Sequence, residues 1–284
     1  MSIELVEKYA GKVDEMFASE SKLSLLTCSD YDWDGAHSVA VYRFSTAPMN
    51  DYSRSRGADF ADTDEAHLSR FGAIRDLSSQ VQHMLLKKDR SFIFNIDLMD
   101  EDETGRALRA ETALARQIRE VCIPEIDTYA YGVMVAGAGT TAAAVELTAD
   151  NVYDYITAAS ESLDDSQVPD TERAIVCTPA VYRMMKKSPD INLDCDVSAE
   201  QRLQGIIAML DGAAVIKVPA ARLPEKFGFM MCHPSATVAP TKLADYGQHD
   251  NTPLSSGTIC TGRLVYDTFV LENKKAGIYV QPTV

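Results

Sequence analysis

Two short stretches of this sequence have residue types and spacings that could do chemistry. The first, Asp-Tyr-Asp-Trp-Asp-Gly at residues 30–35, matches the first half of a calcium loop, with oxygen ligands at positions one, three and five and glycine at six. Position twelve is Val41, where a bidentate glutamate is required, and a strand-like run follows where a helix is needed. We interpret the stretch as an acidic turn that leads into a strand, with Trp33 packed beneath it.

The second stretch, Gly137-x-Gly139-x-x-Ala142, has the spacing of a dinucleotide-binding fingerprint. That fingerprint must follow a strand and open a helix, so that pyrophosphate can approach the helix N-terminus. Here the glycines close a long helical pattern, which favours a helix-ending glycine turn. A soluble nucleotide-dependent enzyme that uses this turn remains the alternative from another functional class.

The remaining polar residues form no recognisable catalytic or metal-binding pattern. The five histidines lack the H-E-x-x-H spacing and other ligand spacings, and no G-x-S-x-G elbow is present, although a triad with distant members stays open. Six cysteines lie far apart without a C-x-x-C pair, which favours buried reduced thiols over disulfides or zinc. We therefore expect no enzyme activity, no cofactor and no metal.

Composition and charge limit the partners. The 284 residues are 46% apolar and 24% charged, which is typical of a globular chain of about two domains or of one domain with large excursions. The formal net charge of -15 repels phosphate backbones and anionic lipid, so any nearby DNA is expected to be contained without tight binding. No run approaches the ~20 apolar residues of a membrane span, and the N-terminus lacks the layout of a secretion signal.

The first third of the chain shows two strand-like runs around a segment that cannot form its own core. Residues 3–17 have the apolar stripe of an amphipathic helix. Strand patterns cover 38–46 and 90–97, and the insertion between them, about 47–88, is rich in charge and short of aliphatic residues. A segment of this kind is typically a functional loop, a disordered region or a piece that packs on another molecule.

A long helix is predicted next. Asp100 and Glu103 form a capping box, good helix formers continue to about Ala136, and Pro124 should kink the helix. Its apolar stripe repeats at intervals of three and four residues. A helix of this length, on the order of 50 Å at 1.5 Å per residue, is too long for one small core to cover.

The rest of the chain alternates short helices and strands and is expected to form a second unit. Thr148, Thr178-Pro179 and Ser198 with Gln201 each mark a helix start. Strands are predicted at 174–177, 213–218, 227–232, 259–271 and 278–281, with 272–277 as a closing hairpin and residues 246–257 as a turn-rich loop.

Several phrases, in this order, resemble the major capsid proteins of tailed bacteriophages and prophages, which have the Hong Kong 97 fold. They are EKYAGKVDEMF, DYDWDGAHSVAVY, STAPMNDYSR, KKDRSFIFNIDLMDEDET, ALARQIREVCIPEIDTYAYG, HPSATVAPTKLADY and RLVYDTFVLENKKAGIYV. The resemblance spans nearly the whole chain and rests on the series of phrases, since none of them is a catalytic motif.

The resemblance implies an α+β, Hong Kong 97-like fold with five parts. They are an N-terminal arm (1–36), an extended β-hairpin loop with flanking strands (37–97), a peripheral domain with a long spine helix (98–144), a mixed α/β axial domain (145–257) and closing strands (258–284). It further implies a structural protein whose copies form the hexamers and pentamers of an icosahedral shell around double-stranded DNA. Neighbouring copies would then cover the insertion and the long helix.

The same resemblance implies a location in the virion capsid, with assembly in the host bacterial cytoplasm. Portal, scaffold and decoration proteins are implied as further partners, and a membrane is not. On this interpretation the candidate subunit contacts are aromatic and basic residues of the arm and loop, because such residues are enriched at interface centres. They are Tyr31, Trp33, Tyr52, Arg54, Arg56, Phe60, Arg70, Lys88 and Arg90.

Two further possibilities follow from the same resemblance. An encapsulin-like compartment has this fold and encloses enzymes in place of a genome, so its contents would distinguish it from a capsid. Some relatives also join subunits through a lysine–asparagine isopeptide bond, and Lys87, Lys88 and Asn273 have the required types. No motif here matches such a bond, and we expect ordinary exposed side chains.

Overall fold

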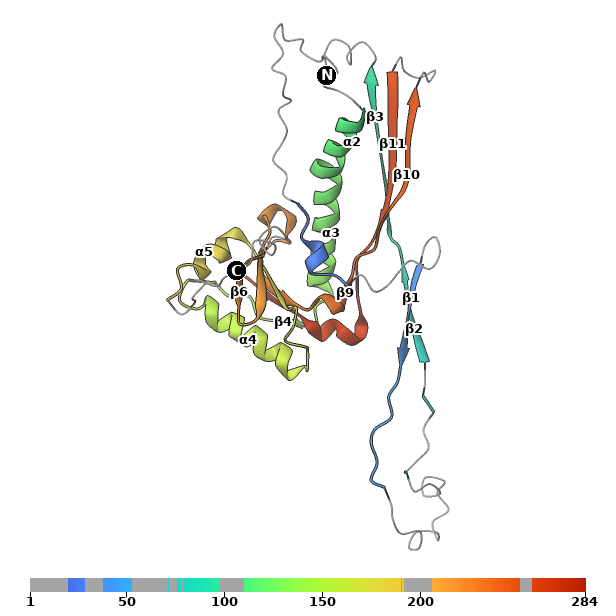
Figure 1. Cartoon of the computed structure of the whole chain (residues 1–284). Coiled ribbons are helices and arrows are strands. Elements are labelled where there is room, and N and C mark those ends of the chain that lie inside the picture. Colours follow the sequence, from blue (N-terminus) through green and yellow to red (C-terminus); the bar gives the residue numbers. More distant parts are fainter. Residues whose placement is uncertain are drawn as a thin grey trace. The chain divides into compact units, whose positions relative to one another are not determined.

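The computed structural model describes residues 20–28, 38–52, 71, 76–77, 79–97, 110–189, 191, 206–250 and 257–284. The chain forms two compact units, drawn in Figure 1. One unit is Trp33–Leu85, and the other combines Met1–Asp32 with Leu86–Val284.

The larger unit is organised by one long helical rod (Figure 1). It comprises α2 (Ala110–Gln117), the π-helical segment η3 (Ile118–Cys122) and α3 (Ile123–Ala136), and Gly137 caps its C-terminal end. Pro124 lies in the first turn of α3. Because proline has no N–H and its ring crowds the carbonyl four residues earlier, the widened π turn accommodates it without ending the rod.

A mixed six-stranded sheet lies beside α3. Its order is β4-β13-β8-β5-β7-β6, with β13/β4 and β5/β7 parallel and the other neighbours antiparallel. The two central strands β5 and β8 are buried along their whole length, as continuous apolar runs should be when both faces are covered. The strands are β4 (Thr140–Thr141), β5 (Ala174–Cys177), β6 (Ile206–Leu210), β7 (Ala213–Lys217), β8 (Phe227–Cys232) and β13 (Ile278–Pro282).

Each face of this sheet has its own core. On one face, Tyr131 and Met134 of α3 pack with Val176 and Met230 of the sheet. On the other face, α4 (Val152–Asp165) and α5 (Pro179–Met185) pack their apolar stripes against the alternate strand residues. The 3-10 segments η1 (Leu23–Leu25) and η4 (Ala220–Arg222) adjoin the α3 side through Leu23 and Leu223.

A second, antiparallel sheet runs along the rod in the order β10-β11-β3 (Figure 1). Its strands are β3 (Lys88–Asp97), β10 (Thr241–Asp250) and β11 (Gly257–Tyr266). Phe92 and Phe94 stack on the same face of β3 with centroids 6.2 Å apart, and Phe92 lies opposite Gly262. A Cβ at Gly262 would overlap the Phe92 ring, so glycine is needed there to admit the aromatic side chain.

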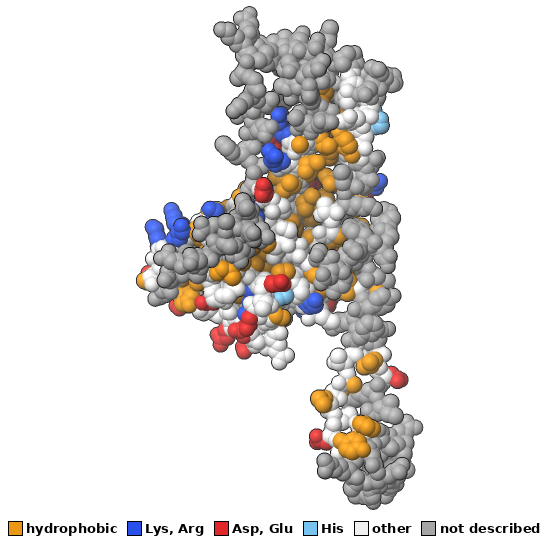
Figure 2. Space-filling model, in the orientation of Figure 1, with side chains coloured by type: hydrophobic (Ala, Val, Ile, Leu, Met, Phe, Trp, Pro, Cys, Tyr) orange, Lys and Arg blue, Asp and Glu red, His pale blue; other side chains and the backbone are white. Residues whose placement is uncertain are grey.

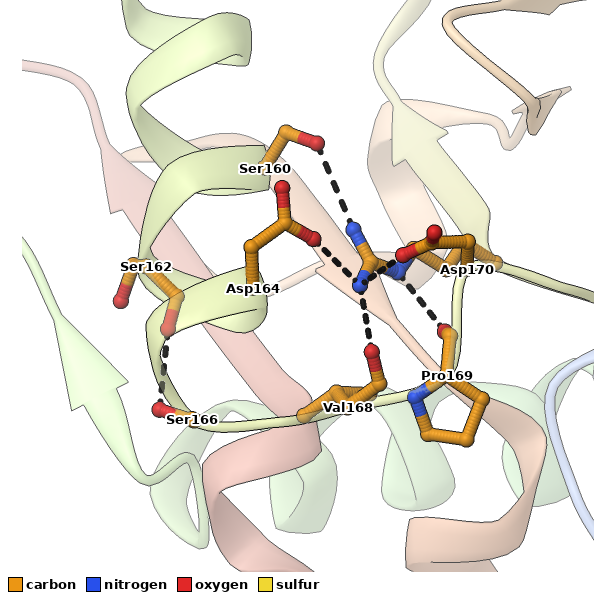
Figure 3. Close-up of polar contacts among 8 residues, drawn as sticks. Ser160, Ser162, Asp164, Ser166, Val168, Pro169 and Asp170 are labelled. Atoms are coloured by element: carbon orange, nitrogen blue, oxygen red, sulfur yellow. Dashed lines mark hydrogen bonds and ion pairs between the residues drawn. The ribbon is translucent and has the colours of Figure 1, made fainter.

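The turn after α4 is held by a buried arginine (Figure 3). Arg173 donates to the Val168 and Pro169 carbonyl oxygens at 2.6 and 2.9 Å and pairs with Asp164 and Asp170 at 2.7 and 2.9 Å. Gln167, at φ 57°, ends the helix in a Schellman arrangement: its N–H donates to the Asp164 backbone carbonyl oxygen, and the Val168 N–H donates to the Leu163 carbonyl oxygen.

The smaller unit contains an antiparallel pair, β1 (Ser38–Phe44) and β2 (Ser79–Leu85), in continuous register from Ser38↔Leu85 to Phe44↔Ser79.

The short strands β9 (Thr237–Val238) and β12 (Phe269–Val270) pair in the larger unit, next to η5 (Pro234–Ala236).

The mixed helix and sheet architecture confirms the predicted α+β class, and most predicted strands are present. The prediction of a closing hairpin at 272–277 is wrong. Residues Glu272–Gly277 form the 3-10 segment η6, and the strands beside it diverge, since β12 pairs with β9 while β13 lies between β4 and β8. The predicted turn-rich loop is wrong over its first five residues, because Tyr246–Asp250 belong to β10.

Other sequence predictions lie outside the described residues. They are the helix at 3–17, the turn at 30–35, the Asp100–Glu103 cap and the helix start at Ser198. Thr178 does cap α5 through its side chain, which accepts a hydrogen bond from Val181 N–H. At α4 the N-cap is Asn151, and Thr148 contributes only its backbone.

Candidate interaction surfaces

A buried carboxylate joins the rod to the β10-β11-β3 sheet. Asp267, 2% exposed, accepts hydrogen bonds from the Tyr129 hydroxyl at 2.8 Å, from Lys87 N–H at 2.9 Å and from Thr268 N–H at 2.8 Å. Lys87 is the second residue of the larger unit after the chain leaves Leu85. Asp267 therefore fixes the start of β3 against α3, since a buried carboxylate requires donors of this kind.

Two tyrosines and two cations surround this junction. Burial, together with the Asp267 hydrogen bond and charge, raises the pKa of Tyr129 to about 12, and burial and Glu125 raise the pKa of Tyr266 to about 12. Both hydroxyls therefore stay protonated and act as donors. Lys88 Nζ lies 5.0 Å from the Tyr129 ring centroid, and Arg90 Nε donates to Glu125 at 2.8 Å.

Three of the nine candidate contact residues lie in the described part of the chain. Lys88 and Arg90 both face α3 and contact side chains of their own copy, while Tyr52 is half exposed and packs edge-on against Phe71 at 5.1 Å. As subunit contacts all nine stay predictions. The six outside the described residues are Tyr31, Trp33, Arg54, Arg56, Phe60 and Arg70.

Sequence reasoning missed Glu125, Tyr129, Tyr266 and Asp267, which give this junction its hydrogen bonds. The available signal was the spacing of four between Glu125 and Tyr129, which puts both on one side of a helix. Their partners Tyr266, at the end of β11, and Asp267, the next residue, could not be inferred, because they are more than a hundred residues away in sequence.

A second junction fixes the N-terminal segment to the rod. Asp127 of α3 accepts from Ser21 Oγ at 2.6 Å and from Arg222 Nη1 at 2.7 Å, and both charged side chains are nearly fully buried. Burial raises the pKa of the Asp127 carboxyl, while Ser21 and Arg222 act in the opposite direction. Through these two contacts, Asp127 of α3 joins residues 20–28 and η4 to the rod.

The glycine turn at 137–139 is filled by the chain itself. Gly139 N–H donates to the Lys275 carbonyl oxygen at 2.9 Å, and a Cβ on Gly139 would overlap that same oxygen. A Cβ on Gly137 would lie 2.8 Å from Val270. The residues that follow form β4, not a helix. These glycines therefore admit η6 and β12, and the geometry that a bound pyrophosphate needs is not present.

The smaller unit exposes an unusual number of large apolar side chains (Figure 2). Met49 is 99% exposed and Phe71 76% exposed. Single exposed apolar residues are ordinary, but a set of this density in one segment is typical of a surface that is covered by another molecule. The set comprises Met49, Tyr52, Phe71, Leu77, Val81 and Leu85.

In the described ranges the cysteines form no disulfide, and the cysteines and acidic side chains form no metal-binding cluster. Among the described residues, five cysteines carry thiols: Cys28 is half-buried, and the other four, Cys122, Cys177, Cys232 and Cys260, are buried. Burial raises the pKa of Cys177 and Cys232 to about 12, so both stay protonated. No group of three or more metal-ligating side chains gathers among the described residues, and none of the described helices has the length and apolar character to cross a bilayer.

Comparison with solved structures identifies the fold. A chain from Mycobacterium phage Che8 superposes with a TM-score of 0.70 at 17% identity, covering 97% of this chain and 96% of that one. The capsid of cyanophage P-SCSP1u gives 0.72 at 12% identity, with 98% and 93% covered, and the mature capsid of bacteriophage PhiM1 gives 0.67 at 14%, with 98% and 92% covered. This chain has a bacteriophage capsid fold.

The capsid fold was predicted from the ordered phrases, and these superpositions confirm it along nearly the whole chain. No protein-family model matches, and neither does any curated protein. At such low identity the likeness lies in the backbone path, and it extends over 97% of this chain in the Che8 match and 98% in the P-SCSP1u match.

Proposed function

We propose that the chain is the major capsid protein of a tailed bacteriophage or prophage, and that its copies assemble into an icosahedral shell around double-stranded DNA. The observation that carries the proposal is the capsid fold over both full lengths, with 97% of this chain and 96% of the Che8 chain aligned. A match from end to end leaves little of the chain for an added catalytic domain. We therefore propose a structural role without enzyme activity or cofactor.

The exposed apolar set of the smaller unit supports self-assembly. Burial of a large apolar side chain contributes roughly 1.5–3 kcal/mol, so covering Met49, Phe71 and Leu77 by a neighbouring copy would stabilise a contact substantially. Summed over several neighbours, contacts of this size hold a closed shell while each alone remains reversible.

Within this proposal the five parts keep their predicted roles: arm (1–36), extended loop (37–97), peripheral domain (98–144), axial domain (145–257) and closing strands (258–284). The nine candidate residues are proposed as contacts between copies. The net charge of -15 supports a container that releases its DNA, because an acidic protein attracts phosphate weakly. Assembly in the host cytoplasm and contacts with portal, scaffold and decoration proteins belong to the same proposal.

Electron microscopy of particles from cells that express the chain, together with analysis of their contents, tests this function. The proposal expects closed icosahedral shells of one size class, and double-stranded DNA inside those made during phage production. Shells filled with an enzyme and free of nucleic acid would support a compartment instead. A compact monomer at every concentration, with or without the other phage proteins, would refute assembly.

A further inference from the structure

Four cations gather where α5 ends. Arg183 lies on α5, Lys186 and Lys187 follow it, and Lys217 is the last residue of β7; all four are exposed. Lys186 and Lys217 both lie over the Tyr182 ring, 5.2 and 5.7 Å from its centroid, which brings the helix end and the strand end into one surface. We call these four residues the basic edge.

The basic edge has no anionic partner within the described chain. None of the ion pairs among the described residues involves a cation of the basic edge. Four like charges repel one another within a Debye length of about 10 Å at 0.1 M salt. In a chain of net charge -15, such a local excess of positive charge is well suited to an acidic surface.

Helix α4 presents that acidic surface. Its sequence contains no lysine or arginine, and its exposed carboxylates lie opposite the buried stripe of Val152, Ile156, Ala159 and Leu163. The acidic stripe comprises Asp154, Glu161 and Asp165 of α4, and none of these is in an ion pair among the described residues.

The acidic stripe carries an electrostatic cost within a single copy. Asp154, Glu161 and Asp165 follow one side of the helix, so their charges repel. Asp165 also lies in the last turn, where the helix dipole disfavours negative charge. Arg173 offsets the neighbouring Asp164 through a 2.7 Å ion pair but does not pair with Asp165. A cationic partner on the outer side of α4 would reduce both the repulsion among these carboxylates and the unfavourable interaction of Asp165 with the helix dipole.

The two surfaces lie on different parts of one layer. Both helices cover the same face of the six-stranded sheet, α4 in contact with β13 and α5 beside Lys217 at the end of β7. In the sheet, β8 and β5 lie between β13 and β7. Figure 2 shows Lys and Arg side chains at the edge near α5 and Asp and Glu side chains gathered apart from them. No ion pair joins the two sets within the described chain.

We propose that the basic edge of one copy binds the acidic stripe of the next copy, head to tail around a capsomer. A contact between two different surfaces repeats from copy to copy and closes into a ring when the rotation allows it. This inference rests on the proposed function. A second copy is favoured over DNA as the partner because the same chain carries a matching set of unpaired carboxylates.

Charge reversal tests the contact in the full-length chain. K186E/K187E removes the net positive charge of the basic edge, because Arg183 and Lys217 then balance the two glutamates, and E161K/D165K places two lysines on the outer side of α4. The quadruple variant exchanges lysines and carboxylates between the two surfaces, so that these positions can pair again, and it keeps the net charge of -15. K274E/K275E, which reverses two exposed lysines of η6, is the control with the same charge change as K186E/K187E. Assembly is followed by sedimentation velocity and electron microscopy, and folding by circular dichroism.

We expect each surface reversal to weaken assembly about tenfold or more, as the loss of several ion pairs at each contact implies. The quadruple variant and the control should assemble like wild type. A mixture of the two reversal variants should assemble more readily than either variant alone, because a K186E/K187E edge beside an E161K/D165K stripe again brings opposite charges together. If a reversal unfolds the chain, K186Q/K187Q replaces it, with a smaller loss expected.

Unchanged assembly of the reversal variants, or no recovery in the quadruple variant, would overturn the contact. Normal shells of K186E/K187E that hold less DNA would also overturn it and assign the basic edge to phosphate. These outcomes leave the proposed function standing. Failure of the wild-type chain to form any shell, with or without the other phage proteins, refutes the proposed function itself.

Discussion

Replacement of Arg222 by Met should strongly destabilise the unassembled subunit. The Asp127 carboxylate, 1% exposed, would lose the guanidinium at 2.7 Å and keep only the Ser21 hydroxyl at 2.6 Å. Removing one partner of a buried pair typically costs about 3–5 kcal/mol, because the remaining charge is uncompensated. Urea unfolding at pH 7.5, followed by circular dichroism, measures the change.

The double variant D127L/R222M separates the pair from simple loss of packing. With both charges gone, no buried charge remains, so the double variant should be more stable than R222M by about 2 kcal/mol or more. Loss of the guanidinium also raises the pKa of Asp127 further, so the cost of R222M should shrink as the pH falls from 7.5 to 5 and the carboxyl binds a proton. A cost under about 1 kcal/mol, or additive effects in the double variant, would refute this reasoning.

Three further predictions concern single positions of the larger unit. Gln167→Gly should raise the free energy of unfolding by about 1 kcal/mol, because glycine adopts φ 57° without a Cβ penalty; an unchanged urea midpoint would contradict this. Gly139→Ala should cost about 1–3 kcal/mol, because its Cβ overlaps the Lys275 carbonyl oxygen, and Gly132→Ala, whose Cβ meets open space, is the matched control in the same unfolding assay. Burial lowers the pKa of His233, so the unfolded chain binds the proton more readily and stability should fall as the pH drops from 7.5 through about 6.5 toward the lowered folded value. His233→Gln should remove that part of the pH dependence, and an identical pH profile in both proteins would count against it.

Where a local pattern determines a local structure, the sequence was sufficient. The strands at 174–177 and 227–232 were predicted with the bounds observed, because continuous apolar runs between turn residues fit strands buried on both faces. Thr178-Pro179 was recognised as a helix start from its capping chemistry alone. The end of the rod at Gly137 likewise follows from the glycines after it.

Where the structure depends on distant partners, the sequence was insufficient. Residues 272–277 have the turn composition of a hairpin, but the flanking strands pair elsewhere, with Val238 and Cys232 among their partners. Much of β10 is polar, and it is a strand because it pairs with β11. The candidate residues Lys88 and Arg90 were chosen for their types, and their contacts with Tyr129 and Glu125 appear only in three dimensions.

A cryo-electron-microscopy reconstruction of the assembled particle shows whether other copies of the chain cover the apolar surface of the smaller unit. We expect a closed icosahedral shell in which Phe71, 76% exposed in the single copy, is buried against a neighbouring subunit together with Tyr52. A particle in which both side chains remain in solvent, or a protein that is only ever a single ordered copy, would contradict it.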